Sequence, residues 1–417
     1  MKFIHAADIH LDSPLSGLTA YPDAPVEVLR TATRQAFTRL VDEAIEEAVT
    51  FMVIAGDLYD GSWKDYNTGH FFCREMGRLH QAGIPVYLLF GNHDAESEMT
   101  RKLLLPPNVH TFDSRQPTTF HIEALRVALH GQSFRDAATT ENLAAGYPPP
   151  VPGALNIGVL HTALEGNAAH ATYAPCSVPE LTARGYGYWA LGHVHEHAVL
   201  REDPWVVFPG NLQGRHVREC GPRGAVLVTA GEDGVQRVER LLVDVLRWQV
   251  IDVDASRLRG LEEVVRAVGR AFEGLLDTAG EHQLSVRVRI IGHTLAHGEL
   301  FGREAHLRAE ILGQAAAIGR DRLWVEKVRV ETAPPADATA LRARSDAVAD
   351  LAELLADAPR DEALLAALAD ELRPLADRAP LELLQTVPEL AAVRSGALAE
   401  LVREVAPGLI AHLATRD

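Results

Sequence analysis

The chain has 417 residues, of which 47% are hydrophobic, and a formal net charge of −17 at pH 7. This length exceeds what one hydrophobic core usually supports, so we expect two or three domains. The acidity argues against a strong sequence-independent attraction to nucleic acid, because such attraction depends on basic residues that neutralise phosphates. Three widely spaced cysteines fit neither a disulfide framework nor a thiolate zinc site. Without a run of eighteen apolar residues or a signal-like segment, the chain is predicted to be soluble and cytoplasmic, with no membrane contact.

The first ninety residues alternate between short apolar strands and amphipathic helices. Residues 2–7 are predicted as a buried strand, and residues 26–49 carry apolar side chains at helical spacing before the wholly apolar run 51–55. A helix at 68–81 then leads to a strand at 85–90. Two successive strand-helix-strand units predict a sheet with helices on its faces and a site at the strand ends.

From residue 109 onward the pattern changes to short strands. Residues 118–130 resemble a hairpin, and apolar strands follow at 155–160 and 186–191. Three further segments are predicted as strands of a second sheet, namely 205–208, 224–229 and 235–243. The predicted class is therefore α/β, a sandwich of two sheets with flanking helices.

The composition shifts near residue 246, and the segment that follows reads as a β-α-β-α-β unit. Its predicted elements are 248–253, 258–276, 285–290, 300–318 and 323–330. Beyond it, the chain is rich in alanine and leucine at helical spacing, and acidic residues outnumber basic ones. We therefore predict three parts: residues 1–245, 246–333 and 334–417.

Side chains suited to metal binding follow five of the predicted strands. Any one of them could be an ordinary polar loop residue, but five coincidences at strand ends favour a metal site. Nitrogen and oxygen ligands without a thiolate suit a pair of divalent first-row ions such as manganese better than a structural zinc. We predict one metal held by Asp8, His10 and His195, a second held by Asn92, His161 and His193, and Asp57 as the bridge between them.

Two ions about 3.5–4 Å apart activate a bridging water and neutralise a phosphoryl oxygen, so the predicted reaction is hydrolysis of a phosphoester. His93 follows the ligand Asn92, but its side chain should leave the strand end in another direction. We predict that His93 protonates the departing oxygen and that Asp94 orients its imidazole or raises its pKa. A histidine in a surface loop is the alternative interpretation.

The motifs ADIH, GDLYD, GNHD, VLHT and GHVH resemble those of the calcineurin-like metallophosphoesterase superfamily. The stretches KFIHAADIHLDSPLSGL and FPGNLQGRHVRE further resemble the SbcD-type DNA repair exonuclease branch, especially its shorter bacterial paralogue group. The resemblance implies an αββα sandwich with a dinuclear site, then a small α/β capping domain and a helical C-terminal segment. It also implies a manganese-dependent nuclease that cleaves DNA from 3′ ends and at single-stranded or hairpin structures. A coiled-coil SbcC-type ATPase would be its partner, docked on the C-terminal helices, and a homodimer is the usual assembly.

Cationic residues in the loop after His195 are candidate DNA contacts, namely Arg215, His216 and Arg218. The alternative is a solvated loop whose arginines pair with Glu219 or another acid. Two rival functions stay open. The same metal site would serve a small-molecule phosphodiesterase or phosphatase, or the chain could act mainly as an interaction subunit of an ATPase complex. The long segment after the sandwich favours the nuclease over a small-molecule enzyme.

Overall fold

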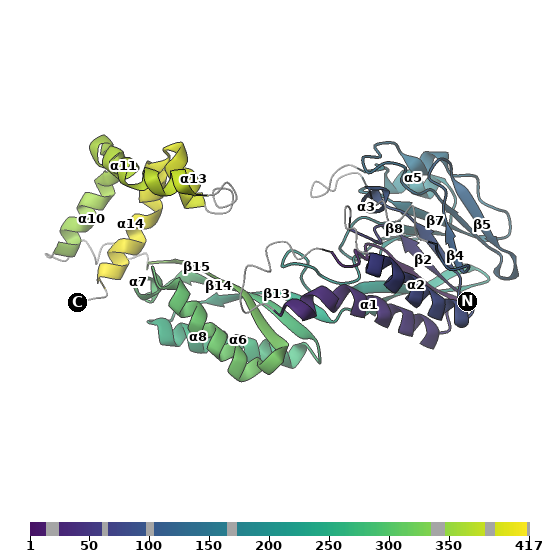
Figure 1. The fold of residues 1–417 in the computed structure, drawn as a ribbon, viewed down its shortest axis with the longest axis horizontal. Helices are drawn as coiled ribbons and strands as arrows, with labels where there is room; N and C mark the ends of the chain where they lie inside the picture. The colour runs from purple at the N-terminus through teal and green to yellow at the C-terminus, as the bar shows by residue number, and fades with distance from the viewer. Residues whose placement is uncertain are drawn as a thin grey trace. The chain divides into compact units, whose positions relative to one another are not determined.

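A computed structural model describes residues 1–13, 25–60, 66–96, 104–164, 173–334, 347–379 and 388–414. The chain divides into two compact units (Figure 1). The first consists of Met1–Gln249 and Glu281–Ser285, and the second of Val250–Gly280 and Val286–Asp417.

The first unit is built on two six-stranded sheets. The first sheet has the order β12-β11-β1-β2-β3-β4. Strands β1 to β4 run parallel, whereas β11 is antiparallel to β1. The bounds of these strands are β1 Lys2–Ala6, β2 Phe51–Ala55, β3 Val86–Leu89, β4 Val109–Thr111, β11 Gly224–Gly231 and β12 Gly234–Leu242.

The second sheet has the order β5-β6-β7-β8-β10-β9. Strands β6, β7, β8 and β10 run parallel, and β5 and β9 are antiparallel edges. The bounds are β5 Thr118–Ile122, β6 Val127–Gly131, β7 Leu155–His161, β8 Tyr188–Gly192, β9 Ala198–Glu202 and β10 Trp205–Phe208.

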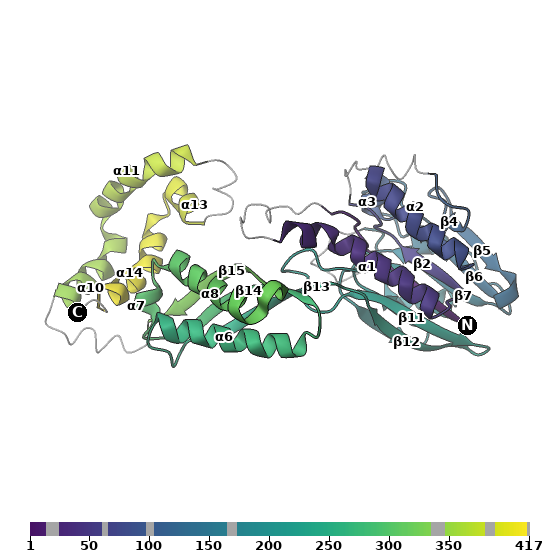
Figure 2. The ribbon, with the colours of Figure 1, turned by 60° about the horizontal axis from the view of Figure 1, so that its bottom comes forward.

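Alternating side chains of the first sheet divide the core into two layers. Phe3 and Val53 point into the space between the sheets, whereas Ile4 and Met52 pack toward the helices. Helices α1 (Val26–Glu46) and α2 (Tyr66–Gln81) cover the outer face of this sheet (Figure 2). On the outer face of the second sheet, Leu181 of α5 (Val178–Ala183) packs in a separate core. The two-sheet sandwich with flanking helices is confirmed.

The prediction that residues 224–229 and 235–243 belong to the second sheet is wrong. Phe3 of β1 lies opposite Val228 of β11, and β12 pairs with β11, so both strands extend the first sheet. Val226 and Val228 point between the sheets, while Ala225 and Leu227 pack on the helical side. A strand buried on both faces has the same pattern in either sheet, so its apolar run does not reveal which sheet it joins.

The second unit contains most of a three-stranded sheet of order β13-β14-β15 and two helix groups. The predicted helix at 300–318 is interrupted after Leu300, because α7 ends there and α8 begins at Glu304. In the C-terminal group, Gly408 lies directly against the ring of Phe301. The bounds are β13 Leu246–Asp254, α6 Leu261–Thr278, β14 Gln283–His293, α7 His297–Leu300, α8 Glu304–Gly319, β15 Leu323–Ala333, α10 Ala347–Asp357, α11 Glu362–Arg378, α13 Pro388–Ser395 and α14 Leu398–Ala414.

None of the helices in the described part of the chain is long and apolar enough to cross a membrane.

Candidate metal centre

The predicted ligands come together where strands of both sheets end. Asp8 and His10 follow β1, Asp57 follows β2, and both carboxylates are almost completely buried. Asn92 begins the short helix α3 (Asn92–Glu96) after β3. The last residue of β7 is His161, and the remaining two ligands, His193 and His195, follow β8. Parallel strands bring their carboxyl ends to one edge of a sheet, so residues far apart in the sequence become neighbours.

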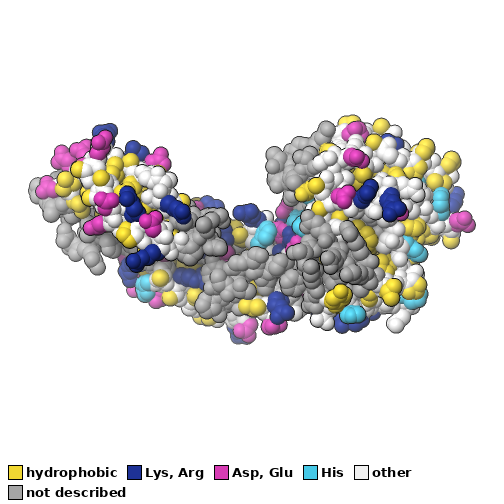
Figure 3. All heavy atoms as spheres, turned by 45° about the horizontal axis from the view of Figure 1, so that its top comes forward, with side chains coloured by type: hydrophobic (Ala, Val, Ile, Leu, Met, Phe, Trp, Pro, Cys, Tyr) yellow, Lys and Arg dark blue, Asp and Glu magenta, His cyan; other side chains and the backbone are white. Residues whose placement is uncertain are grey.

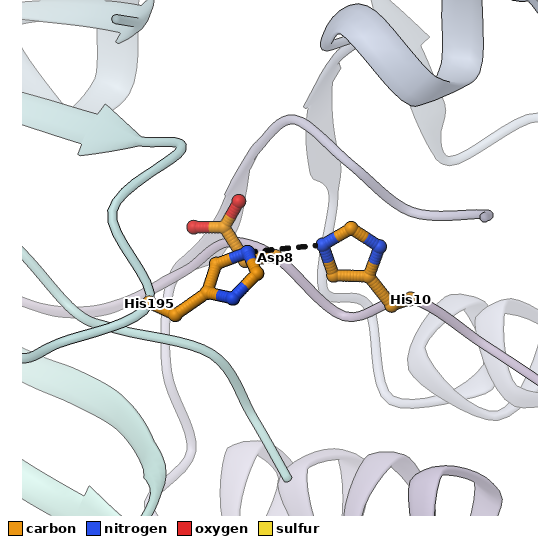
Figure 4. A group of neighbouring side chains, drawn as sticks. All are labelled: Asp8, His10 and His195. Atoms are coloured by element: carbon orange, nitrogen blue, oxygen red, sulfur yellow. Dashed lines mark hydrogen bonds between the residues drawn. The ribbon is translucent and has the colours of Figure 1, made fainter. Parts of the chain in front are cut away.

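One group consists of Asp8, His10 and His195, whose ligand atoms lie within 4.8 Å of one another. The Nε2 atoms of His10 and His195 are 3.3 Å apart. In Figure 4 the two imidazoles point toward each other with Asp8 beside the gap. The Asp8 carboxylate also accepts the backbone N–H of His193 at 3.0 Å, which fixes its direction. This group matches the three residues predicted for one metal.

A second group consists of Asp57, His161 and His193, again with ligand atoms within 4.8 Å of one another. Nε2 of His161 lies 3.0 Å from Oδ1 of Asn92 and 3.4 Å from Oδ2 of Asp57. The same Asp57 oxygen is 3.7 Å from Nε2 of His10 in the first group. One carboxylate oxygen therefore faces both groups, which is the position predicted for a bridging ligand.

The backbone at these ligands is left-handed, which is uncommon for residues other than glycine. Asp8 has φ 50°, Asp57 has φ 52° and His193 has φ 97°. A Cβ at Gly192 would overlap the carbonyl oxygen of Ala55, so only glycine allows β8 to approach β2 this closely. Strained backbone of this kind is retained where the surrounding structure holds it, commonly at functional sites.

The buried carboxylates and imidazoles determine one another's charge. Burial raises the pKa of Asp8 to about 6. Burial also acts to raise the pKa of Asp57, but His161 and His10 outweigh it and hold that pKa below its usual range. Burial lowers the pKa of His161, yet the Asp57 carboxylate outweighs this and raises it to about 9. The proton on His161 thus compensates carboxylate charge that divalent cations would compensate when bound, whereas burial lowers the pKa of His10. The oxygen and nitrogen donors suit such ions.

The structure revises the role predicted for Asp94. Its carboxylate accepts the backbone N–H groups of Leu58, Tyr59 and Gly91 at 3.0–3.1 Å, so it braces the turns after β2 and β3. Nδ1 of His93 instead lies 3.2 Å from Oδ1 of Asp60. Adjacent residues on a helix point in different directions, so Asp94 in α3 does not face the imidazole of His93. Asp60 occupies the orienting position.

Glu219 belongs to the centre, although the sequence suggested it only as a partner for arginine. Its Oε1 lies 2.7 Å from Nδ1 of His195, and its side chain is 6% exposed. A carboxylate behind a metal-binding histidine fixes the ring and its tautomer. The signal available in the sequence was the acidic end of the stretch GRHVRE.

The three candidate DNA contacts separate into two kinds. The Arg215 side chain is 16% exposed and turns toward the centre, with Nη2 3.0 Å from Oε1 of Glu219. Arg215 therefore pairs with Glu219, which is the alternative that the sequence left open. His216 and Arg218 have exposed side chains.

The chain is similar to known families and proteins. Residues 1–197 match the calcineurin-like phosphoesterase family, and residues 248–333 match the middle domain of metallophosphoesterase YhaO. Over 279 residues the chain is 35% identical to the uncharacterized metallophosphoesterase YhaO of Bacillus subtilis (strain 168), covering 66% of this chain and 68% of that protein. The chain belongs to the calcineurin-like metallophosphoesterases. Enzymes of this family use two divalent metal ions, and the two ligand groups above fit that requirement.

This metallophosphoesterase also has weaker similarity to other proteins. It is 26% identical over 304 residues to the DNA double-strand break repair protein Mre11 of Methanopyrus kandleri, which covers 65% of this chain and 63% of that protein. A solved structure of a dimetal phosphatase from Danio rerio aligns with 58% of this chain and 98% of that chain, with 11% identity and a TM-score of 0.35.

The centre has the parts that phosphoester hydrolysis needs. Bound divalent ions would supply an activated water and stabilise charge on the phosphoryl oxygens. Asp57 would bind both ions. Each of the other six predicted ligands would bind only one of the two. Because Asp60 occupies Nδ1 of His93, Nε2 is the atom that can give a proton to the departing oxygen. The His93 side chain is 38% exposed, so a substrate can reach it.

Proposed function

We propose that this metallophosphoesterase is a manganese-dependent DNA nuclease that hydrolyses phosphodiester bonds, as a 3′–5′ exonuclease and a structure-specific endonuclease in DNA repair. The observation that carries the hydrolytic part is the Asp57 oxygen that faces both ligand groups, next to the half-exposed His93. Manganese is supported by the donor set, which contains carboxylate, amide and imidazole groups but no thiolate.

DNA as the substrate is supported by two observations of different kinds. The first is the sequence similarity to an archaeal protein named for DNA double-strand break repair. The second is the pair of exposed side chains His216 and Arg218 in the loop that carries Arg215 and Glu219. The Arg218 guanidinium at this place would meet phosphates that flank the bond being cleaved, whereas burial lowers the pKa of His216, which would contribute a neutral hydrogen-bonding group.

The test is digestion of single- and double-stranded DNA, labelled at either end, by metal-free protein to which Mn²⁺ is added back. We expect mononucleotide release from 3′ ends, and we expect His93→Ala to abolish it with little change in Mn²⁺ binding. His121→Ala removes an exposed histidine of β5 and serves as the matched control. Protein that hydrolyses bis(4-nitrophenyl) phosphate but degrades no DNA would make the small-molecule phosphodiesterase the correct function.

We further propose that the C-terminal helices dock a coiled-coil ATPase of the SbcC type. Large apolar side chains are exposed there, with Leu354 on α10 at 69%, Leu375 on α11 at 62% and Val405 on α14 at 39%. Figure 3 shows apolar side chains among both acidic and basic ones on one face of these helices. Exposed apolar groups of this kind are typical of surfaces that bind another protein.

Leu354→Asp combined with Leu375→Asp tests this docking surface. With a co-expressed candidate ATPase, we expect the double variant to lose co-purification while it keeps wild-type hydrolysis of bis(4-nitrophenyl) phosphate. Light scattering of the protein alone distinguishes a second copy of the chain from an ATPase as the occupant. Retained co-purification, or a dimer that the double variant converts to a monomer, would contradict the proposal.

A further inference from the structure

We infer that Arg215 is a positioning residue of the hydrolytic centre, which holds the carboxylates of Asp60 and Glu219 and through them the imidazoles of His93 and His195. This inference rests on the proposed hydrolysis at this centre, but not on DNA being the substrate. It replaces the role of a DNA contact that the sequence suggested for Arg215.

The guanidinium of Arg215 makes contacts on both of its sides. Toward Glu219, Nη2 lies 3.0 Å from Oε1, and Nε lies 3.4 Å from Oε2. Toward Asp60, Nη1 lies 3.6 Å from Oδ2 and donates to Oγ of Ser13 at 3.4 Å. Because the side chain is only 16% exposed, its donors are directed into the protein.

One oxygen of the Asp60 carboxylate faces Arg215, and the other contacts His93. The Ser13 hydroxyl donates to Oδ2, the oxygen that also faces Arg215. Oδ1 remains for Nδ1 of His93 at 3.2 Å, and it lies 3.8 Å from Nδ1 of His10. Arg215 and Ser13 therefore fix the plane of the carboxylate that orients the proposed proton donor.

Glu219 shares its two oxygens in the same way. Oε1 lies next to His195, whereas Oε2 accepts from Nδ2 of Asn211 at 3.0 Å and from the backbone N–H of Arg215 at 2.8 Å. A carboxylate buried to this degree is unfavourable without a cation beside it. Arg215 supplies that cation, and the same guanidinium also faces Asp60.

A DNA contact would require the guanidinium to turn outward and leave both carboxylates. Its planar, forked shape is what lets one side chain serve two acceptors at once. Lysine keeps the positive charge that a phosphate contact needs, but its single ammonium cannot reproduce the fork. Arg215→Lys therefore separates the two roles.

The experiment compares full-length Arg215→Lys with wild type. The control is Arg237→Lys, in which the arginine of an exposed pair with Glu239 on β12, 2.7 Å apart, is changed in the same way. We expect Arg215→Lys to lower kcat for bis(4-nitrophenyl) phosphate by about tenfold or more and to weaken one of two Mn²⁺ sites in calorimetric titration. The KM for DNA and its dependence on salt should stay as in the wild type.

Ser13→Ala is the second variant, because it removes one contact to Asp60 and leaves Glu219 and His195 in place. We expect a lower kcat with unchanged Mn²⁺ binding. The inference would be overturned if Arg215→Lys hydrolysed the small diester with wild-type kcat, but had a higher KM for DNA that depended less on salt. If circular dichroism finds Arg215→Lys unfolded, Ser13→Ala decides, and an unchanged kcat refutes the positioning role. If the wild type hydrolyses the small diester but cleaves no DNA, the proposed nuclease function is refuted, and the result for Arg215 still stands.

Discussion

Glu219→Gln is the change that tests most directly how the metal centre is supported. The Glu219 carboxylate accepts hydrogen bonds from Asn211 and Arg215 and lies 2.7 Å from Nδ1 of His195. Glutamine has nearly the same shape, but it replaces one acceptor oxygen with an NH2 group. That NH2 group must then face a donor of Asn211, Arg215 or His195, and the negative charge behind the imidazole is lost.

The size of the effect follows from the bonds that are lost. A hydrogen bond to a charged group contributes about 1.5–3 kcal/mol. Partners behind metal ligands typically change metal affinity by about 10–100-fold, which corresponds to about 1.4–2.8 kcal/mol. Since His195 belongs to one ligand group only, we expect that loss at one metal site and none at the other.

Calorimetric titration of metal-free protein with Mn²⁺ measures both sites. Glu239→Gln, which removes the exposed partner of Arg237, is the control and should bind Mn²⁺ as the wild type does. Equal weakening of both sites, or wild-type affinity at both, would refute the assignment of Glu219 to His195 and to a single metal.

Two further changes test the packing around the centre. Gly192→Ala should lower the melting temperature and the Mn²⁺ affinity together, because the added methyl overlaps the carbonyl oxygen of Ala55; wild-type melting would contradict this. His5 is fully buried between Tyr188 and the carbonyl of Leu191, and burial lowers its pKa to about 3. Below pH 6.5, His5 is therefore protonated in the unfolded chain but stays neutral in the folded protein. As the pH decreases, this difference lowers the free energy of unfolding by up to about 1.4 kcal/mol per pH unit. In urea unfolding of metal-free protein, His5→Gln should make this decline less steep, and parallel curves for variant and wild type would contradict the explanation.

Much of the fold could be predicted from local patterns of hydrophobicity. The apolar runs 51–55 and 205–208 coincide with β2 and β10. The sheet that each strand joins was harder to predict. Both faces of β11 are buried, and they would be buried in either sheet, so its apolar pattern does not show which sheet it joins. Its pairing with β1 depends on contacts across the whole first unit.

The sequence by itself determined which residues could bind metals, because Asp8, Asp57 and His161 each stand where a strand ends, and parallel strands bring such ends together. Only the tertiary structure decided what stands behind those residues. Asp60 faces His93, and Asp94 does not. His93 and Asp94 are neighbours in one helix, so their side chains point in different directions, whereas Asp60 lies in a separate turn that folds back toward His93. The inward direction of Arg215 was likewise decided by two carboxylates, one of them on a distant loop.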